Sequence, residues 1–182
     1  MEEHGNTKEH GNAVVDHTLV IFKPDCIVKS LTGNIISRLS EAHLRIIGAK
    51  VIKVSRELAE KHYAHLVEKP FFNDLYDYFS GKDYGPDYER VIAFVYKGVD
   101  ACGRVRRIVG ATDPNEADPT TIRGAYGRRN KKGVIENVIH CSDSLASAEN
   151  EIKNWFTPEE IVESIYPVKT AVVHGVERLV WG

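Results

Sequence analysis

Short runs of β-branched and aromatic residues alternate with segments of helical period along this chain, and this alternation restricts the folds open to it. Residues 18–22, 46–54 and 91–96 predict strands, and residues 138–140 predict a fourth. Two short helices precede the third strand in place of one long crossover. The pattern therefore favours an α+β sandwich, with one sheet covered by helices, over a doubly wound sheet.

Polar residues predict where several helices begin. Ser55 and Asp100 precede helical segments as N-caps, and a further helix is expected from about Ser144. Residues 157–160 form a capping box with proline at the first helical position, which predicts another helix start. Residues 110–133 show no periodicity, and a loop of that length inside a compact domain is usually functional.

Composition and charge exclude some classes of protein. The 182 residues suit one domain, and their formal net charge of -2 disfavours a protein that neutralises a nucleic-acid backbone. No stretch reaches the roughly 18 apolar residues of a membrane span, so we expect no membrane association. We divide the chain into a flexible N-terminal tail (1–16), a folded domain (17–167) and a C-terminal extension (168–182).

The cysteines indicate the cellular compartment. Cys26, Cys102 and Cys141 are odd in number and show neither paired spacing nor zinc-ligand spacing. The N-terminal residues lack the apolar core of a signal peptide. These features predict a reducing, cytoplasmic location.

The most informative segment for chemistry is residues 137–144, which places His140 at a strand end just before a helix start. A neutral imidazole can attack phosphorus with one ring nitrogen while a carboxylate holds the proton on the other. Glu151, roughly two turns into the following helix, is a candidate for that carboxylate. The alternative is a capping or core histidine beside serines that cap the helix.

This segment and several others resemble the nucleoside diphosphate kinase family. The family's signature Asn-x-x-His-(Gly or Ala)-Ser-Asp matches residues 137–143 except at Cys141. The resemblance extends over about residues 18–166. Further matches follow in the family's order: Lys23-Pro24-Asp25, His62-Tyr63, Lys69-Pro70-Phe71-Phe72, Gly110-Ala111-Thr112-Asp113-Pro114, Thr121-Ile122-Arg123-Gly124 and Ser147-Ala148-Glu149.

The resemblance implies both a fold and an activity. The fold is a ferredoxin-like α/β sandwich with a four-stranded antiparallel sheet covered by helices. The activity is reversible transfer of the terminal phosphate from ATP to nucleoside diphosphates by a ping-pong mechanism through a phosphohistidine on His140, which supplies GTP, CTP, UTP and dNTPs. Mg²⁺ and a homo-oligomer, a hexamer or a tetramer, are also implied.

Matching positions imply roles for individual residues. Lys23, Tyr63 and Asn137 would surround the transferred phosphate and act in catalysis with His140 and Glu151, because donors aimed at its oxygens stabilise a loose transition state. The alternative for Lys23 is a solvated strand end, that for Tyr63 is a core aromatic, and that for Asn137 is a turn residue.

Nucleotide binding would involve further matched positions. Arg106, Thr112 and Arg123 would bind the α and β phosphates, since a guanidinium suits a diphosphate. Arg104 and Arg107 compete with Arg106, which the family spacing to Thr112 favours.

Other matched positions concern the base and the metal ion. Phe71 and Leu75 would line the base site, with Val134 as its other wall; core packing is the alternative for Phe71 and Leu75. Asp143 would assist Mg²⁺ through water. The P-loop and GxGxxG patterns are missing, so side chains must bind the phosphates.

Several departures from the family pattern leave alternatives open. Cys141 replaces a small residue and suggests inactivation by oxidation beside the histidine, and Glu136 takes a usual arginine position. Residues 81–88 and 128–133 are insertions; the second is basic and is either a solvated loop or a contact with phosphates or a neighbouring subunit. A regulator that binds nucleotides without turnover, and a ferredoxin-like nucleic-acid-binding module, are the rival functions.

Overall fold

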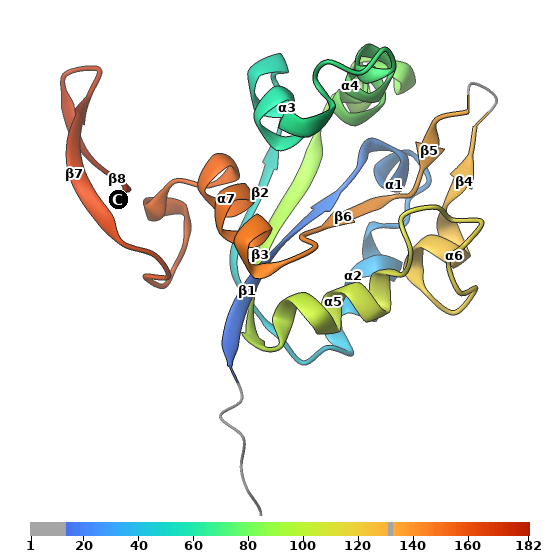
Figure 1. Cartoon of the computed structure of the whole chain (residues 1–182), viewed down its shortest axis with the longest axis horizontal. Coiled ribbons are helices and arrows are strands. Elements are labelled where there is room, and N and C mark those ends of the chain that lie inside the picture. Colours follow the sequence, from blue (N-terminus) through green and yellow to red (C-terminus); the bar gives the residue numbers. More distant parts are fainter. Residues whose placement is uncertain (1–13, 131–132) are drawn as a thin grey trace, which may run out of the picture.

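The sheet at the centre of the computed structural model is four-stranded and fully antiparallel, in the order β2-β3-β1-β6 (Figure 1). The structure describes residues 14–130 and 133–182. The expected α+β sandwich is thereby confirmed. The four strands are β1 (Val15–Phe22), β2 (Arg45–Ile52), β3 (Val91–Val99) and β6 (Ile139–Cys141).

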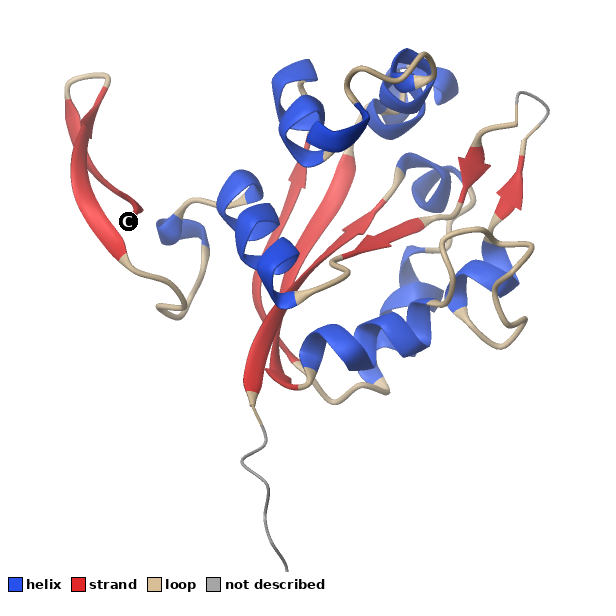
Figure 2. Ribbon diagram, viewed as in Figure 1, coloured by secondary structure: helices blue, strands red, loops and turns tan. Residues whose placement is uncertain are grey.

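Helices cover both faces of this sheet (Figure 2). The alternation of β1 explains why: Leu19 and Ile21 enter one hydrophobic core, whereas Val20 and Phe22 enter the other. The first core is closed by α3, α4 and α7, and the second by α1, α2, α5 and α6. The helices are α1 (Pro24–Val28), α2 (Thr32–Ser40), α3 (Arg56–His62), α4 (Phe72–Ser80), α5 (Ala101–Val109), α6 (Ile122–Tyr126) and α7 (Leu145–Trp155).

Helices begin after Ser55, Asp100 and Ser144 as predicted, but of the two predicted N-caps, Ser55 and Asp100, only Ser55 caps its helix with its side chain. Ser55 accepts the backbone N–H of Leu58, and Ser144 accepts that of Ser147. Asp100 stands at the N-cap position of α5 in a left-handed backbone conformation (φ 51°), and its carboxylate instead pairs with Arg107 at 2.9 Å. The Asp100 carboxylate therefore binds a nearby guanidinium and not the backbone N–H groups at the helix end.

Short elements occupy the segments that were expected to be loops or a helix. Residues 81–88 contain two 3₁₀ helices, η2 (Lys82–Tyr84) and η3 (Pro86–Tyr88). Residues 110–133 are not wholly irregular, since they contain α6 and β4 (Arg128–Arg129), which pairs with β5 (Ile135–Glu136). These elements are too short to show a period. The Thr157 capping box is present but starts only a 3₁₀ turn, η4 (Pro158–Glu160).

The chain ends in an antiparallel hairpin of β7 (Val168–Val173) and β8 (Val176–Trp181) that projects from the sandwich (Figure 1). The indole N–H of Trp181 donates to the carbonyl of Phe156 at 2.7 Å, which ties the hairpin to the body. The predicted N-terminal tail, 1–16, lies outside the described residues up to residue 13. Among the helices of residues 14–130 and 133–182, none is long and apolar enough to cross a bilayer.

Candidate active site

One cavity of about 540 Å³ lies beside β6, between the α3–α4 region and α5. Its volume suits a small-molecule ligand. All twelve side chains that the sequence predicts for catalysis, nucleotide binding or metal binding line it. They are Lys23, Tyr63, Phe71, Leu75, Arg106, Thr112, Arg123, Val134, Asn137, His140, Asp143 and Glu151.

His140 and Glu151 form a hydrogen-bonded pair within the cavity. The histidine lies on β6 opposite Ile21 of β1, and the glutamate projects from α7. The Nε2 atom of His140 lies 3.0 Å from Oε2 of Glu151, which also accepts the Ser142 hydroxyl at 2.6 Å. A carboxylate in this position fixes the imidazole proton on Nε2. The Nδ1 atom then carries the lone pair.

The environment keeps this imidazole uncharged. Burial, followed by the positive charges of Lys23 and Arg123, holds the pKa of His140 well below its usual value. Burial also raises the pKa of Glu151, and the Ser142 hydroxyl opposes that rise. A neutral imidazole with a free lone pair is the nucleophilic form, and at neutral pH no proton has to be removed from Nδ1 first.

A chain of hydrogen bonds fixes the cationic side of the cavity. The ammonium of Lys23, which is only 6% exposed, donates to Oδ1 of Asn137 at 2.7 Å. The amide of Asn137 donates in turn to the carbonyl of Thr112 at 2.9 Å. Burial, and then the charge of Arg123, lowers the pKa of Lys23 to about 7. An anion bound here would restore the full charge of the ammonium.

Arg123 is held from behind by backbone carbonyls. It comes from α6, whose first turn is capped by Thr121, and its guanidinium donates to the carbonyls of Ile139 and Gly110 at 3.1 Å. Its side chain is buried, whereas Arg106 at the end of α5 is exposed. The cavity therefore holds one buried and one exposed guanidinium, both suited to phosphate oxygens.

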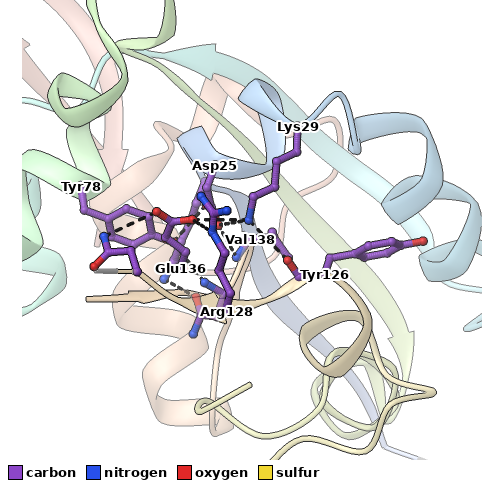
Figure 3. Close-up of polar contacts among 10 residues, drawn as sticks. Asp25, Lys29, Tyr78, Tyr126, Arg128, Glu136 and Val138 are labelled. Atoms are coloured by element: carbon purple, nitrogen blue, oxygen red, sulfur yellow. Dashed lines mark hydrogen bonds and ion pairs between the residues drawn. The ribbon is translucent and has the colours of Figure 1, made fainter. Parts of the chain in front are cut away.

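A buried polar network that includes Asp25, Tyr78 and Val138 (Figure 3) reaches Asn137, whose backbone N–H donates to the Tyr78 hydroxyl at 3.3 Å. Asp25, fully buried, accepts the Tyr78 hydroxyl and the backbone N–H of Val138, each at 3.0 Å. Val138 has a left-handed backbone (φ 59°), which is unfavourable for a β-branched residue. The carboxylate of Asp25 thus holds the strained residue next to Asn137 in place.

Glu136 extends this network toward the surface. Its buried carboxylate accepts a hydrogen bond from Arg128 at 2.7 Å and lies 3.5 Å from the ammonium of Lys29 (Figure 3). Burial alone would raise the pKa of Glu136, but the hydrogen bond from Arg128 and the nearby cations outweigh burial and lower it. Arg128, whose side chain is 61% exposed, pairs with Glu136 in this structure. Arg129 likewise pairs with Asp113.

The opposite end of the cavity is apolar and open. Phe71 precedes α4 with 49% of its surface exposed, and Leu75 and Val134 are half-buried near it. An exposed aromatic face can stack on a flat ring without reading its hydrogen-bonding edge.

Sequence reasoning missed several lining or supporting residues. Asp25 and His62 were noted only as parts of matched motifs, and Tyr78 was not singled out. Each lies on a helix, where its position in the sequence does not distinguish it from a core residue. Its role becomes visible only from its buried hydrogen-bond partner. Leu66 and Ile135 add apolar lining.

The cavity also contains carboxylates that suit a hard cation. Asp143 is exposed at the cavity wall, and hydrogen bonds from Ser147 lower its pKa, so the group is ionised at neutral pH. Mg²⁺ commonly takes one or two carboxylates, several waters and the phosphates of a substrate. Asp143 fits an outer role in such a set.

A neutral histidine facing a cationic, nucleotide-sized cavity on an antiparallel sheet defines a phosphotransferase. The sequence profile of the nucleoside diphosphate kinase family matches residues 16–161. The chain is 49% identical to the nucleoside diphosphate kinase of Pyrococcus furiosus over 149 residues, 82% of this chain and 88% of the relative. It is 43% identical to that of Listeria monocytogenes over 148 residues, 81% and 93% of the two chains.

Solved structures agree with the sequence matches. A halophilic nucleoside diphosphate kinase from Halobacterium salinarum in complex with CDP has a TM-score of 0.72 at 37% identity, covering 84% of this chain and 94% of that one. A transition-state mimic of the Borrelia burgdorferi enzyme with vanadate and ADP has a TM-score of 0.71 at 34% identity, covering 83% and 92%. The chain belongs to the nucleoside diphosphate kinase family.

Membership confirms the fold and the activity predicted from the sequence. The protein transfers phosphate between nucleotides, and enzymes of this family require a divalent cation. Both rival functions, the inactive regulator and the nucleic-acid-binding module, are therefore set aside.

Proposed function

We propose that His140 is the nucleophile and that Nδ1 is its reacting atom. The pairing of Nε2 with Glu151 at 3.0 Å carries this proposal, because it leaves Nδ1 unprotonated in the cavity. Nδ1 attacks the γ-phosphorus of ATP, the bond between that phosphorus and the bridging oxygen breaks, and ADP leaves with the electron pair. A second nucleoside diphosphate then takes the phosphate from Nδ1.

The other predicted residues divide between the phosphates and the base. Lys23, Tyr63 and Asn137 surround the transferred phosphate, and their donors offset the charge that develops on its oxygens. Arg106, Thr112 and Arg123 bind the α and β phosphates. Phe71, Leu75 and Val134 hold the base, and Asp143 contacts Mg²⁺ through water; all four residues line the same cavity.

We also propose a homo-oligomer, a hexamer or a tetramer, that acts in the cytoplasm. Within the described residues 14–130 and 133–182, strand β2 forms an edge of the sheet and pairs only with β3, and it exposes Ile46 (47%) and Val51 (62%). An exposed apolar edge strand of this kind is usually covered by another element or by another subunit. The three free cysteines are consistent with a reducing compartment. Native mass spectrometry measures the subunit number.

The test of the nucleophile uses γ-labelled ATP. The parent should acquire acid-labile label on the protein, and GDP should remove it as labelled GTP. His140→Asn should acquire none, while His174→Asn, altered at the exposed hairpin turn, should behave as the parent. Acid-stable label, or equal labelling of His140→Asn, would refute the proposal.

A further inference from the structure

His62 ends α3 beneath the cavity, and its neighbours fix the position of its proton. Its side chain is buried (8% exposed) and contributes to the cavity lining. The indole N–H of Trp155 donates to His62 Nδ1 at 3.2 Å. Because an indole can only donate, Nδ1 must carry a lone pair. Burial and the neighbouring His140 keep the pKa of His62 well below its usual value, so the ring is neutral and its proton lies on Nε2.

This Nε2–H has no acceptor in the resting structure. It is one of two buried side-chain polar atoms without a hydrogen bond in residues 14–130 and 133–182; the other, on His17, is not part of the cavity lining. A buried donor left without a partner costs about 1–3 kcal/mol. Lys23, Asn137, His140 and Glu151 are all hydrogen-bonded, so the His62 donor is an exception among these polar groups of the site.

The reactive groups next to His62 are the hydrogen-bonded side chains of His140 and Glu151. The two imidazole rings are 4.4 Å apart between centroids at an angle of 77°. One ring nitrogen from each histidine and one carboxylate oxygen of Glu151 all lie within 4.8 Å of one another. A nitrogen of His62 therefore lies within 4.8 Å of a Glu151 carboxylate oxygen, and because His62 Nε2 has no hydrogen bond at rest, the ring must shift before its N–H can donate to the carboxylate.

Two histidines and a carboxylate at this spacing also resemble a transition-metal site. A metal ligand nitrogen must offer a lone pair. The Nε2–H of His140 donates a hydrogen bond to Glu151. The Nε2 atom of His62 carries a proton because the indole N–H of Trp155 is bonded to the other ring nitrogen. The set therefore presents donors toward an anion, and a cation is disfavoured.

We propose that His62 is a positioning residue for phosphotransfer, whose Nε2–H donates to the Glu151 carboxylate as His140 gains positive charge. The proposal rests on the role assigned to His140 above. When Nδ1 bonds to phosphorus, the imidazole becomes cationic and its attraction to the carboxylate grows. A further donor keeps that carboxylate ionised and in place, which stabilises the transition state more than the resting state.

The groups around Glu151 define what its ionisation depends on. His62 and Tyr63 face it from the end of α3, and His140 and Ser142 face it from β6 and the residue after it. Asp143 and Cys141 complete the surroundings. Burial raises the pKa of Glu151, and a donor from His62 acts against that rise.

The experiment compares three variants by single-turnover phosphorylation from ATP across pH. His62→Gln keeps an acceptor for Trp155 and an N–H near the Nε2 position, so it should react within a few-fold of the parent. His62→Leu combined with Trp155→Phe removes both partners of the hydrogen bond, which limits the cost in stability. It should react about 10- to 100-fold more slowly than Trp155→Phe alone, the loss expected for a hydrogen bond to a charged group.

Two further measurements exclude a merely structural role. In the double variant the acid limb of the pH–rate profile should move to higher pH, because Glu151 protonates more easily, while the dissociation constant of ADP stays unchanged. Equal rates and equal acid limbs for the double variant and Trp155→Phe would overturn the proposal. So would a His62→Gln variant as slow as the double variant, since ring packing would then explain the effect.

Zinc ions test the assigned tautomer. Inhibition of the parent by micromolar Zn²⁺ that His62→Gln abolishes would place a lone pair on His62 Nε2 and overturn the proposal. Insensitivity of both proteins supports it. A parent without acid-labile label on His140 would refute the proposed function instead, so the two failures are distinguishable.

Discussion

The two ends of the cavity differ in how firmly their side chains are held. At the phosphate end, Lys23 and Arg123 are 6% and 7% exposed and donate to fixed carbonyl or amide oxygens. At the base end, Phe71 is 49% exposed and offers only an apolar face. In the proposed function, the rigid end binds the phosphate chain common to all nucleotides and the open end contacts the base. We therefore expect broad base tolerance.

Removing the buried ammonium should give the largest effect. Lys23→Met keeps an unbranched side chain of similar length but removes the donor, so phosphorylation of His140 should slow by about 10²- to 10³-fold in single turnover. The melting temperature should not fall, because a buried charge that loses solvation is removed. Lys53→Met, altered at the exposed residue that follows β2, is the control. A loss below tenfold would show that the phosphate end does not depend on this cation.

The network below Asn137 should matter next. Asp25→Asn leaves a single amide oxygen for two donors, Tyr78 and the strained Val138, so one buried donor loses its partner. The expected cost is about 1–3 kcal/mol of folding free energy, and a shift of Asn137 by about 1 Å would slow phosphorylation up to about 100-fold.

Thermal unfolding and single-turnover labelling measure both effects of Asp25→Asn, with the exposed Asp87→Asn as control. An unchanged melting temperature together with an unchanged labelling rate would mean that the phosphate end keeps its geometry without this carboxylate.

The contrast between the two ends also explains what the sequence could predict. Lys23, Asn137 and His140 lie in short motifs at strand ends, and the β-branched and aromatic run of residues 18–22 predicted a strand of the sheet. The supporting contacts could not be predicted, because Asp25 reaches Val138 across 113 positions of the chain. Asp100 shows the same limit of prediction at a helix end, because its carboxylate accepts a hydrogen bond from Arg107, seven residues away, and does not cap the helix.

At the open end the effects should be small and alike for all bases. Phe71→Ala should weaken ADP, GDP and CDP binding by about 1 kcal/mol, roughly fivefold, the low end of the range for stacking because the ring is half-exposed. Phe71→Leu should lose less, since an apolar contact remains. Calorimetric dissociation constants check this. A change confined to one base would show that Phe71 selects among bases.

The smallest effect should come from the thiol beside the nucleophile. Oxidation at Cys141 was a plausible route to inactivation in the sequence, but the residue is only 5% exposed, and burial raises its pKa to about 11. Only the thiolate reacts with peroxide, and roughly one thiol in ten thousand is ionised at pH 7. Parent and Cys141→Ala should therefore lose activity at the same slow rate in peroxide. Faster loss by the parent would mean that the phosphate end opens to solvent far more than its burial indicates, and the contrast with the base end would weaken accordingly.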